Sequence, residues 1–266
     1  MTQGSARISN SHYHSDPAIS SSMLKTMTAH GPKAYFNTFL NPKRPKRKET
    51  AAMFLGTLTH CAILEPDELD KRFKVVSSRT TKKGKEEAAE AEKAGLIPTT
   101  QSDMDSAINM RKAVFDNKEA KIHLSKGTAE KSFWRNDDAT GLVMKARSDW
   151  EYGSTLVDLK TSRGGASPKE FGKAVANFGY HLQARHYLNV TGFDRFIFIV
   201  VQSDWPYDVG LYELDDDAMQ EGQRLCRKGL NKIAECELAG EWPGWADRGV
   251  RKLSLPRWAF PTPTDK

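Results

Sequence analysis

Three strand-like segments follow one another between residues 130 and 162, and they restrict the fold more than any other feature of the chain. The segments are "EKSFWRN" (130–136), "GLVMKARSDW" (141–150) and "STLVDLKTS" (154–162). Only "DDAT" and "EYG" separate them, and connections this short join antiparallel neighbours. The sequence therefore predicts a β-meander.

A helix signature follows the meander. Ser167 can cap the helix, Pro168 suits its first position and Glu170 completes a capping box. Gly192 would come after its last turn. We therefore expect one helix that crosses over from the meander to the next strand.

The remaining segments complete an α/β pattern. Before the meander we expect two short helices in 18–40, a strong helix ended by Pro66, a short strand at "RFKVVSS", and charged or amphipathic helices up to residue 124. After the crossover helix we expect strands at 195–202 and 207–214 and a helix at 216–238. This order predicts a central mixed β-sheet flanked by helices, in a single domain spanning 1–266. Residues 1–17 should be flexible, and 240–266 should pack as a tail on the domain or on a neighbouring subunit.

The composition narrows the class of protein. Hydrophobic residues make up 38% of the chain and charged residues 28%, and no apolar run reaches the roughly 18 residues of a membrane span. The N-terminus lacks the apolar region of a secretory signal, and three cysteines without CxxC spacing indicate reduced thiols, so we expect a cytoplasmic protein. A net charge of +6 permits a polyanionic partner such as nucleic acid.

Asp158 and Lys160 occupy an unusual place for charged side chains. Leu156, Val157 and Leu159 around them are residues of a strand packed on both faces. Being two positions apart, the acid and the lysine share one face of that strand. The alternative is an ion pair on a solvated sheet face, but burying such a pair for stability alone is unfavourable.

Asp149 can join this pair through a hairpin. It lies near the end of the preceding strand, where Lys145 and Arg147 share its face. A short turn would bring it close to Asp158, and two partly buried carboxylates raise each other's pKa unless a cation neutralises them. Mg²⁺ does so through oxygen ligands, so the pattern favours a metal site.

Other polar residues fall on buried faces. Helical spacing places His60 on a stripe with Gly56, although a satisfied core histidine is the common alternative. Gln183 and Tyr187 are spaced i, i+4, and beside them runs an apolar stripe of Phe171, Val175, Phe178 and Leu182. Glu130 opens the first strand of the meander and by itself would be an edge-strand acid.

Together these segments resemble the PD-(D/E)xK nuclease superfamily, and most closely its exonuclease VIII (RecE-type) branch, which is distantly similar to phage lambda exonuclease. The resemblance covers about residues 18 to 260. It runs through "LGTLTHCAILEPDELDKRF", "RTTKKGKEE", "RSDW…LVDLKTS", "YHLQARHYL" and "EWPGW…KLSLPRWA". Five segments in the same order are more specific than any one of them.

The resemblance implies a metal site. Asp149, Asp158 and His60 would bind the metal with the backbone carbonyl of Leu159. The cofactor would be Mg²⁺, with Mn²⁺ as the alternative, at one or two ions per active site. Ser148 replaces the proline of the family signature, and an aspartate at 158 in place of glutamate leaves the number of ions open.

It also implies catalytic roles and an activity. Lys160 would position the attacking water, Gln183 and Tyr187 would hold the DNA strand or orient the catalytic groups, and Glu130 would assist them. The implied enzyme is a metal-dependent exodeoxyribonuclease that degrades linear double-stranded DNA from its ends, 5′→3′. It would work with a single-strand annealing protein (RecT-like) as a homo-oligomeric ring, a tetramer in preference to a trimer, and without a membrane.

Contacts to DNA of any sequence should rest on phosphate. Two basic segments and a serine cluster at a helix start are the candidates, with solvated loops and simple helix capping as the alternatives. The candidate residues are Ser20, Ser22, Arg44, Arg47, Arg79, Lys82 and Lys83.

Two other functions remain compatible with the sequence. One is a single-strand-specific or endonucleolytic member of the same superfamily, and the other is a catalytically silent DNA-binding module. The intact set of Asp149, Asp158 and Lys160 favours an enzyme.

Overall fold

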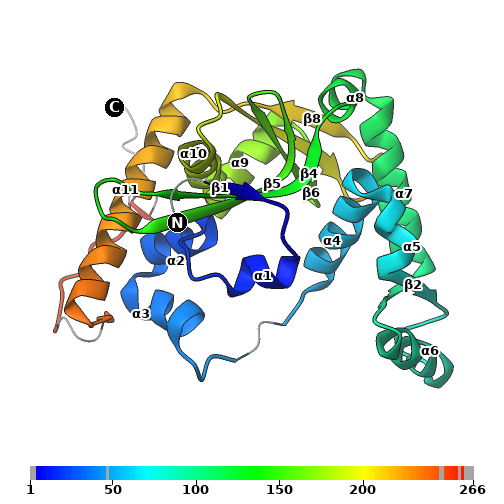
Figure 1. Cartoon of the computed structure of the whole chain (residues 1–266), viewed down its shortest axis with the longest axis horizontal. Coiled ribbons are helices and arrows are strands. Elements are labelled where there is room, and N and C mark those ends of the chain that lie inside the picture. Colours follow the sequence, from blue (N-terminus) through cyan, green and yellow to red (C-terminus); the bar gives the residue numbers. More distant parts are fainter. Residues whose placement is uncertain (1–3, 46–47, 246–248, 257–258, 261–266) are drawn as a thin grey trace.

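A central mixed sheet dominates the computed structural model, which describes residues 4–45, 48–245, 249–256 and 259–260 (Figure 1). The six strands lie in the order β1-β4-β5-β6-β7-β8. They are β1 (Gly4–Ala6), β4 (Thr128–Asn136), β5 (Val143–Tyr152), β6 (Thr155–Ser162), β7 (Arg195–Gln202) and β8 (Val209–Tyr212). Strands β6 and β7 run parallel and the other neighbours antiparallel, which confirms the predicted α/β class.

The meander forms as its turns predict. Strands β5 and β6 meet with Tyr152 opposite Thr155, which leaves a two-residue loop. Gly153 in that loop has φ 56°, a left-handed conformation that tight hairpin loops need and glycine adopts without strain. In the β4–β5 turn, Asp137 accepts hydrogen bonds from the backbone N–H (3.1 Å) and the hydroxyl (2.6 Å) of Thr140.

The predicted crossover helix is two helices. Ser167 caps α9 (Pro168–Phe178) as expected, but Gly179 follows with φ 61° and ψ 41°, and α10 (Tyr180–Thr191) starts after it. Phe178 is the last residue of α9, at the helix end next to this break, and it is 61% exposed, so the prediction that it joins the apolar stripe was wrong. Phe171, Val175 and Leu182 are buried as expected.

Two sets of helices build the cores on the sheet. Helices α2 (Ser21–His30), α10 and α11 (Asp216–Ala239) share one cluster with β4 and β5, in which Leu24, Leu182, Ile233 and Ala146 are fully or almost fully buried. Helices α4 (Ala51–Leu64), α7 (Gln101–Asp116) and α8 (Lys118–Leu124) share a second cluster with β6 and β7. Helix α9 packs through Phe171 on a third. The short elements between them are α1 (Asn10–Ser15), α3 (Pro32–Tyr35), a π-helix (Phe36–Leu40), a 3₁₀ turn (Pro66–Glu68) and α5 (Leu69–Arg72).

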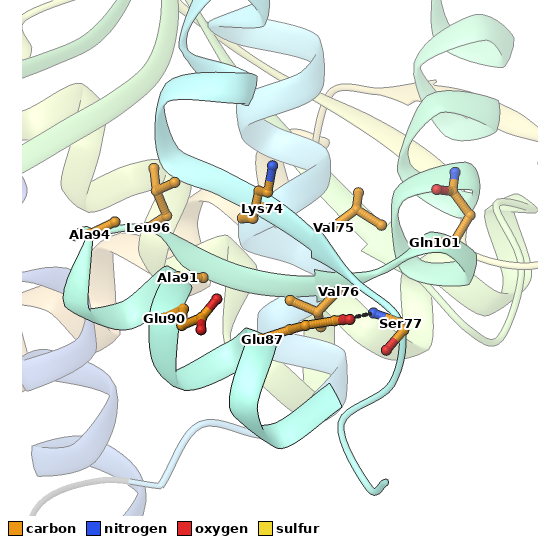
Figure 2. Close-up of a pocket in the computed structure, with 10 residues that line it drawn as sticks. All are labelled: Lys74, Val75, Val76, Ser77, Glu87, Glu90, Ala91, Ala94, Leu96 and Gln101. Carbon is orange, nitrogen blue, oxygen red and sulfur yellow. Dashed lines mark hydrogen bonds between the residues drawn. The ribbon is translucent and has the colours of Figure 1, made fainter. Parts of the chain in front are cut away.

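A small two-stranded sheet stands apart from the central one. Strand β2 (Phe73–Val76) pairs in parallel with β3 (Ile97–Thr100), and α6 (Lys82–Lys93) connects them. Figure 2 shows the pocket of about 630 Å³ beside this unit, where Glu87 of α6 accepts a hydrogen bond from the Ser77 N–H at 2.6 Å. None of the predicted catalytic or metal-binding residues lines this pocket.

Both ends of the described chain make contacts. Residues Gly4–Ala6 pair with β4, and α1 follows, within the segment for which we predicted flexibility. Further along, the Trp242 ring stacks on Tyr35 with centroids 5.1 Å apart, and the packing of 240–266 as a tail stays a prediction. In the part of the chain that the structure describes, no helix combines the length and apolar character that crossing a membrane requires.

Candidate metal centre and active site

Strands β5 and β6 pair only near their turn, and the candidate site begins where pairing stops. The last paired residues are Trp150 and Val157, so Asp149 and Asp158 would come next. Instead, the Asp149 Oδ2 atom accepts a hydrogen bond from the Leu159 N–H at 2.8 Å. At this point the Asp149 side chain, and not the backbone of β5, forms the hydrogen bond to β6. This bond holds the Asp149 carboxylate in place.

Three side chains meet at this carboxylate. His60 of α4, Glu130 of β4 and Asp149 of β5 each offer one possible ligand atom. These three atoms lie within 4.8 Å of one another. His60 Nδ1 is 3.6 Å from Asp149 Oδ2. Gly56, one turn before the histidine, faces β6, where an added Cβ would lie 3.6 Å from Thr161 Oγ1. The helix therefore packs closely enough to bring its imidazole to the sheet.

The surroundings of Glu130 disfavour the ionised form of its carboxyl group. Burial and the nearby charge of Asp149 raise its pKa to about 7, although Arg147 at 3.8 Å opposes the shift. Its backbone has φ 54°, which is rare for a residue other than glycine and common at functional sites. A cation between the two carboxylates would relieve their repulsion. Two carboxylates and an imidazole thus fit a divalent metal ion.

Asp158 lies beside this trio rather than in it. It is 2% exposed, and its Oδ1 accepts a hydrogen bond from Gln183 Nε2 at 2.7 Å while Oδ2 pairs with Lys160. Burial raises the pKa of Asp158, and the charge of Asp149 adds to this, whereas Lys160 opposes it. Burial lowers the pKa of Lys160, but the charges of Asp158 and Asp149 outweigh it, so the net shift is upward. The two aspartates and the lysine therefore lie close together, as the hairpin predicted.

A cavity of about 880 Å³ gives access to this arrangement. Residues from many parts of the chain line it, among them Asn10, His60, Glu130, Lys160 and Tyr180. Leu159, whose carbonyl was predicted as a ligand, also lines it. Of the trio, His60 and Glu130 directly line the same cavity as Lys160.

Arg147 and the N-terminal segment line the cavity, although we predicted no role at the site for either of them from the sequence. Arg147 is 9% exposed and donates hydrogen bonds to Ser132 Oγ (2.9 Å), Asn10 Oδ1 (3.2 Å) and the Ile8 carbonyl oxygen. Ile8, Ser9 and Asn10 consequently form one wall of the cavity. One feature of the sequence could have indicated a role for Arg147 at the site: it shares a strand face with Asp149.

Tyr187, predicted as a partner of Gln183, is a packing residue in the structure. It lies one turn after Gln183 on α10, and its ring meets Phe196 edge-on with centroids 5.8 Å apart. Burial raises the pKa of its hydroxyl well above 10, with smaller contributions from Tyr13, Asp158 and Asp149. Its catalytic role stays a prediction.

The predicted DNA contacts lie outside the cavity lining, as far as the structure describes them. Ser20 caps α2, where its hydroxyl accepts a hydrogen bond from the Met23 N–H at 3.4 Å, and Ser22 is exposed in the first turn. Arg44 donates to the Phe39 carbonyl oxygen at 2.7 Å. Arg47 lies outside the described residues.

The second basic segment borders α6. Arg79 donates to the Pro98 carbonyl oxygen at 2.7 Å, and its guanidinium lies 4.0 Å from the Phe54 ring centroid. Lys82 and Lys83 open α6 and are exposed. Binding of DNA by either segment stays a prediction.

A mixed sheet with acids on two adjacent strands, one of them two positions before a lysine, defines the PD-(D/E)xK type of nuclease fold. The family model described as "PDDEXK-like domain of unknown function (DUF3799)" matches residues 20–249, and the chain belongs to that family. The comparison with curated proteins finds no match.

One solved structure agrees with this fold. One described as a "putative exonuclease" from Eubacterium rectale aligns over 94% of this chain and 96% of its own, with 16% identity and a TM-score of 0.65. The structure of SSO0001 aligns over 79% of this chain and 84% of its own at 14% identity, but its TM-score of 0.29 carries no argument. Fold and family together indicate a nuclease of the PD-(D/E)xK type.

Proposed function

We propose that this protein is a Mg²⁺-dependent exodeoxyribonuclease that degrades linear double-stranded DNA from its ends, 5′→3′, and exposes single strands for annealing. The meeting of His60, Glu130 and Asp149 within 4.8 Å, next to the Asp158–Lys160 pair, carries the proposal. A donor set of this kind, opening into a cavity, suits hydrolysis of a phosphodiester better than a structural ion pair does.

Each residue has a separate task in this reaction. A bound divalent ion would polarise the phosphate and lower the pKa of an attacking water. Asp149, locked by the Leu159 N–H, would hold that ion with Glu130 and His60. Lys160 reaches the cavity and would stabilise negative charge on the phosphate or hold the water. Asp158 keeps the lysine in place and remains the second predicted metal ligand.

The finer parts of the proposal rest on the resemblance to the RecE-type branch. They are the choice of duplex ends, the 5′→3′ direction, the annealing partner and the ring-shaped oligomer. The net charge of +6 supports a DNA substrate.

Digestion of end-labelled DNA tests the proposal. We expect loss of linear duplex labelled at its 5′ or 3′ end only when Mg²⁺ is present, with early release of the 5′ label and no attack on closed-circular duplex. Asp149→Ala should abolish digestion. Cleavage of the circle would indicate an endonuclease, and full activity of Asp149→Ala would reject the site.

A further inference from the structure

Lys25 of α2 takes part in a chain of hydrogen bonds that ends at the active-site acid. Its Nζ donates to Gln183 Oε1 at 3.0 Å, and Gln183 Nε2 donates to Asp158 Oδ1 at 2.7 Å. The chain therefore links α2 through α10 to β6, and it ends on the carboxylate oxygen of Asp158 that does not pair with Lys160. None of the sequence motifs singled out this lysine.

The half-buried side chain of Lys25 runs past Gly179 and the Tyr180 ring. An added Cβ at Gly179 would lie 3.5 Å from the lysine Cγ, in ordinary van der Waals contact, so the lysine stem runs directly beside the turn between α9 and α10. Lys25 Nζ lies 5.1 Å from the centroid of the Tyr180 ring, and Lys160 Nζ lies 5.0 Å from the same centroid. One aromatic ring thus holds two ammonium groups next to one carboxylate.

Stability alone does not account for this placement. Within the described residues, Lys25 pairs with an amide and not with a carboxylate. Removing a cation from water without a direct counter-ion is unfavourable. A lysine kept in such a position is expected to serve the group to which it points.

The direction of the hydrogen bonds shows what the lysine does. An ammonium group only donates, so it selects the carbonyl oxygen of Gln183 and leaves the amide nitrogen for Asp158. If Gln183 were turned over, its oxygen would face the Asp158 carboxylate and repel it. Lys25 thus fixes the one orientation in which Gln183 can donate to Asp158.

We propose that Lys25 is a positioning residue of the active site, which acts through Gln183 to hold Asp158, and with it Lys160, in the productive arrangement. The activity arm of its test rests on the proposed nuclease function. A separate arm, which does not use activity, keeps the two proposals distinguishable.

The activity arm compares Lys25→Met, Gln183→Met and the double variant. Methionine keeps the packing of the lysine stem and removes the donor. We expect Lys25→Met to lower kcat on linear duplex DNA about tenfold, the size of one hydrogen bond to a charged system, with KM within about twofold. The double variant should be no slower than Gln183→Met, because both changes break the same chain.

Two controls separate positioning from charge and folding. Lys33→Met removes an exposed lysine of α3 and should leave kcat unchanged. Lys25→Arg keeps a cationic side chain that donates hydrogen bonds and cannot accept them. It should therefore recover most of the rate lost in Lys25→Met. Thermal unfolding of every variant shows whether a loss of rate is a loss of fold.

The second arm follows the Gln183 side-chain amide by NMR in protein with ¹⁵N-labelled glutamine, assigned by its disappearance in Gln183→Met. We expect Lys25→Met to shift that resonance, and Lys33→Met to leave it in place, whether or not the protein degrades DNA. An unmoved resonance would overturn the proposal. So would additive losses in the double variant, since they would show that Lys25 acts independently of Gln183, or an effect confined to KM, since it would indicate a direct contact of Lys25 with DNA.

Discussion

The Asp149 carboxylate accepts a hydrogen bond from the Leu159 backbone N–H at 2.8 Å, at the point where β5 and β6 stop pairing. This bond aligns one acid of the site with the strand that carries the other acid and the lysine. It also leaves the second oxygen of Asp149 for a ligand.

Asp149→Asn should preserve the bond to Leu159, because the amide oxygen can still accept it, while removing the negative charge. We expect the rate of digestion to fall by a factor of about 100 to 1000, comparable with the loss of one preorganised group in other enzymes. Titration calorimetry with Mn²⁺ should show weaker binding. Asp138→Asn, in the exposed β4–β5 turn, is the matched control and should behave like the wild type. Equal Mn²⁺ affinity in both variants would contradict the assignment.

Glu130→Gln should stabilise the metal-free protein and weaken metal binding at the same time. The raised pKa of Glu130, about 7, means that burial and Asp149 disfavour its ionised form, so its charge lowers stability as the pH rises from about 4.5 to 7 and fully above that range. The side chain is 34% exposed, which reduces the effect to about 1 kcal/mol. Urea unfolding at pH 8 in the presence of a chelator measures it. A destabilised variant would show that Arg147 dominates.

His186 should make the protein sensitive to acid. It is fully buried, its Nε2 lies 2.9 Å from the Lys145 carbonyl oxygen, and burial lowers its pKa to about 4. Since the unfolded histidine has a pKa near 6.5, its contribution to stability is present above that value and is lost as the pH falls toward 4. Lowering the pH from 7 to 5 should cost about 2 kcal/mol of unfolding free energy through this group. In His186→Gln the pH dependence should be smaller by that amount, as measured by urea unfolding at both pH values.

Two glycines offer a matched pair of substitutions in the α9–α10 region. Gly179 has φ 61° and lies against the Lys25 stem, so Gly179→Ala should lower the unfolding free energy by about 1 to 2 kcal/mol. Gly172 is exposed within α9 and an added Cβ there meets nothing within 4 Å, so Gly172→Ala should raise it by about 0.5 to 1 kcal/mol. Thermal or urea unfolding checks both signs. The same sign for both would contradict the helix break.

The local signals of the sequence predicted most of the fold. The meander, the Ser167 cap and the strand at 195–202 depend on neighbouring residues, so pattern and turn chemistry were sufficient. Gly179 was missed because a glycine within a helical pattern is tolerated as often as it ends the helix. In the structure the backbone of Gly179 is left-handed and ends the helix. The pattern of the neighbouring residues does not show this conformation.

The sequence predicted that Asp149, Asp158 and Lys160 lie together, but not how they group with their neighbours. Asp149, Asp158 and Lys160 were found because they are charges in strands. Their division into a candidate metal-binding trio and a separate Asp158–Lys160–Gln183 network depends on where the two strands stop pairing. That is a tertiary property, as is the arrival of Asn10 at the cavity.

The N-terminal wall of the cavity has a consequence for how the protein is made. Asn10 and Arg147 lie 137 positions apart in the chain, yet their contact helps to close the cavity. A ribosome must therefore release more than half of the polypeptide before the two can meet. Incomplete chains would hold only a fragment of the candidate site until synthesis of the polypeptide is well advanced.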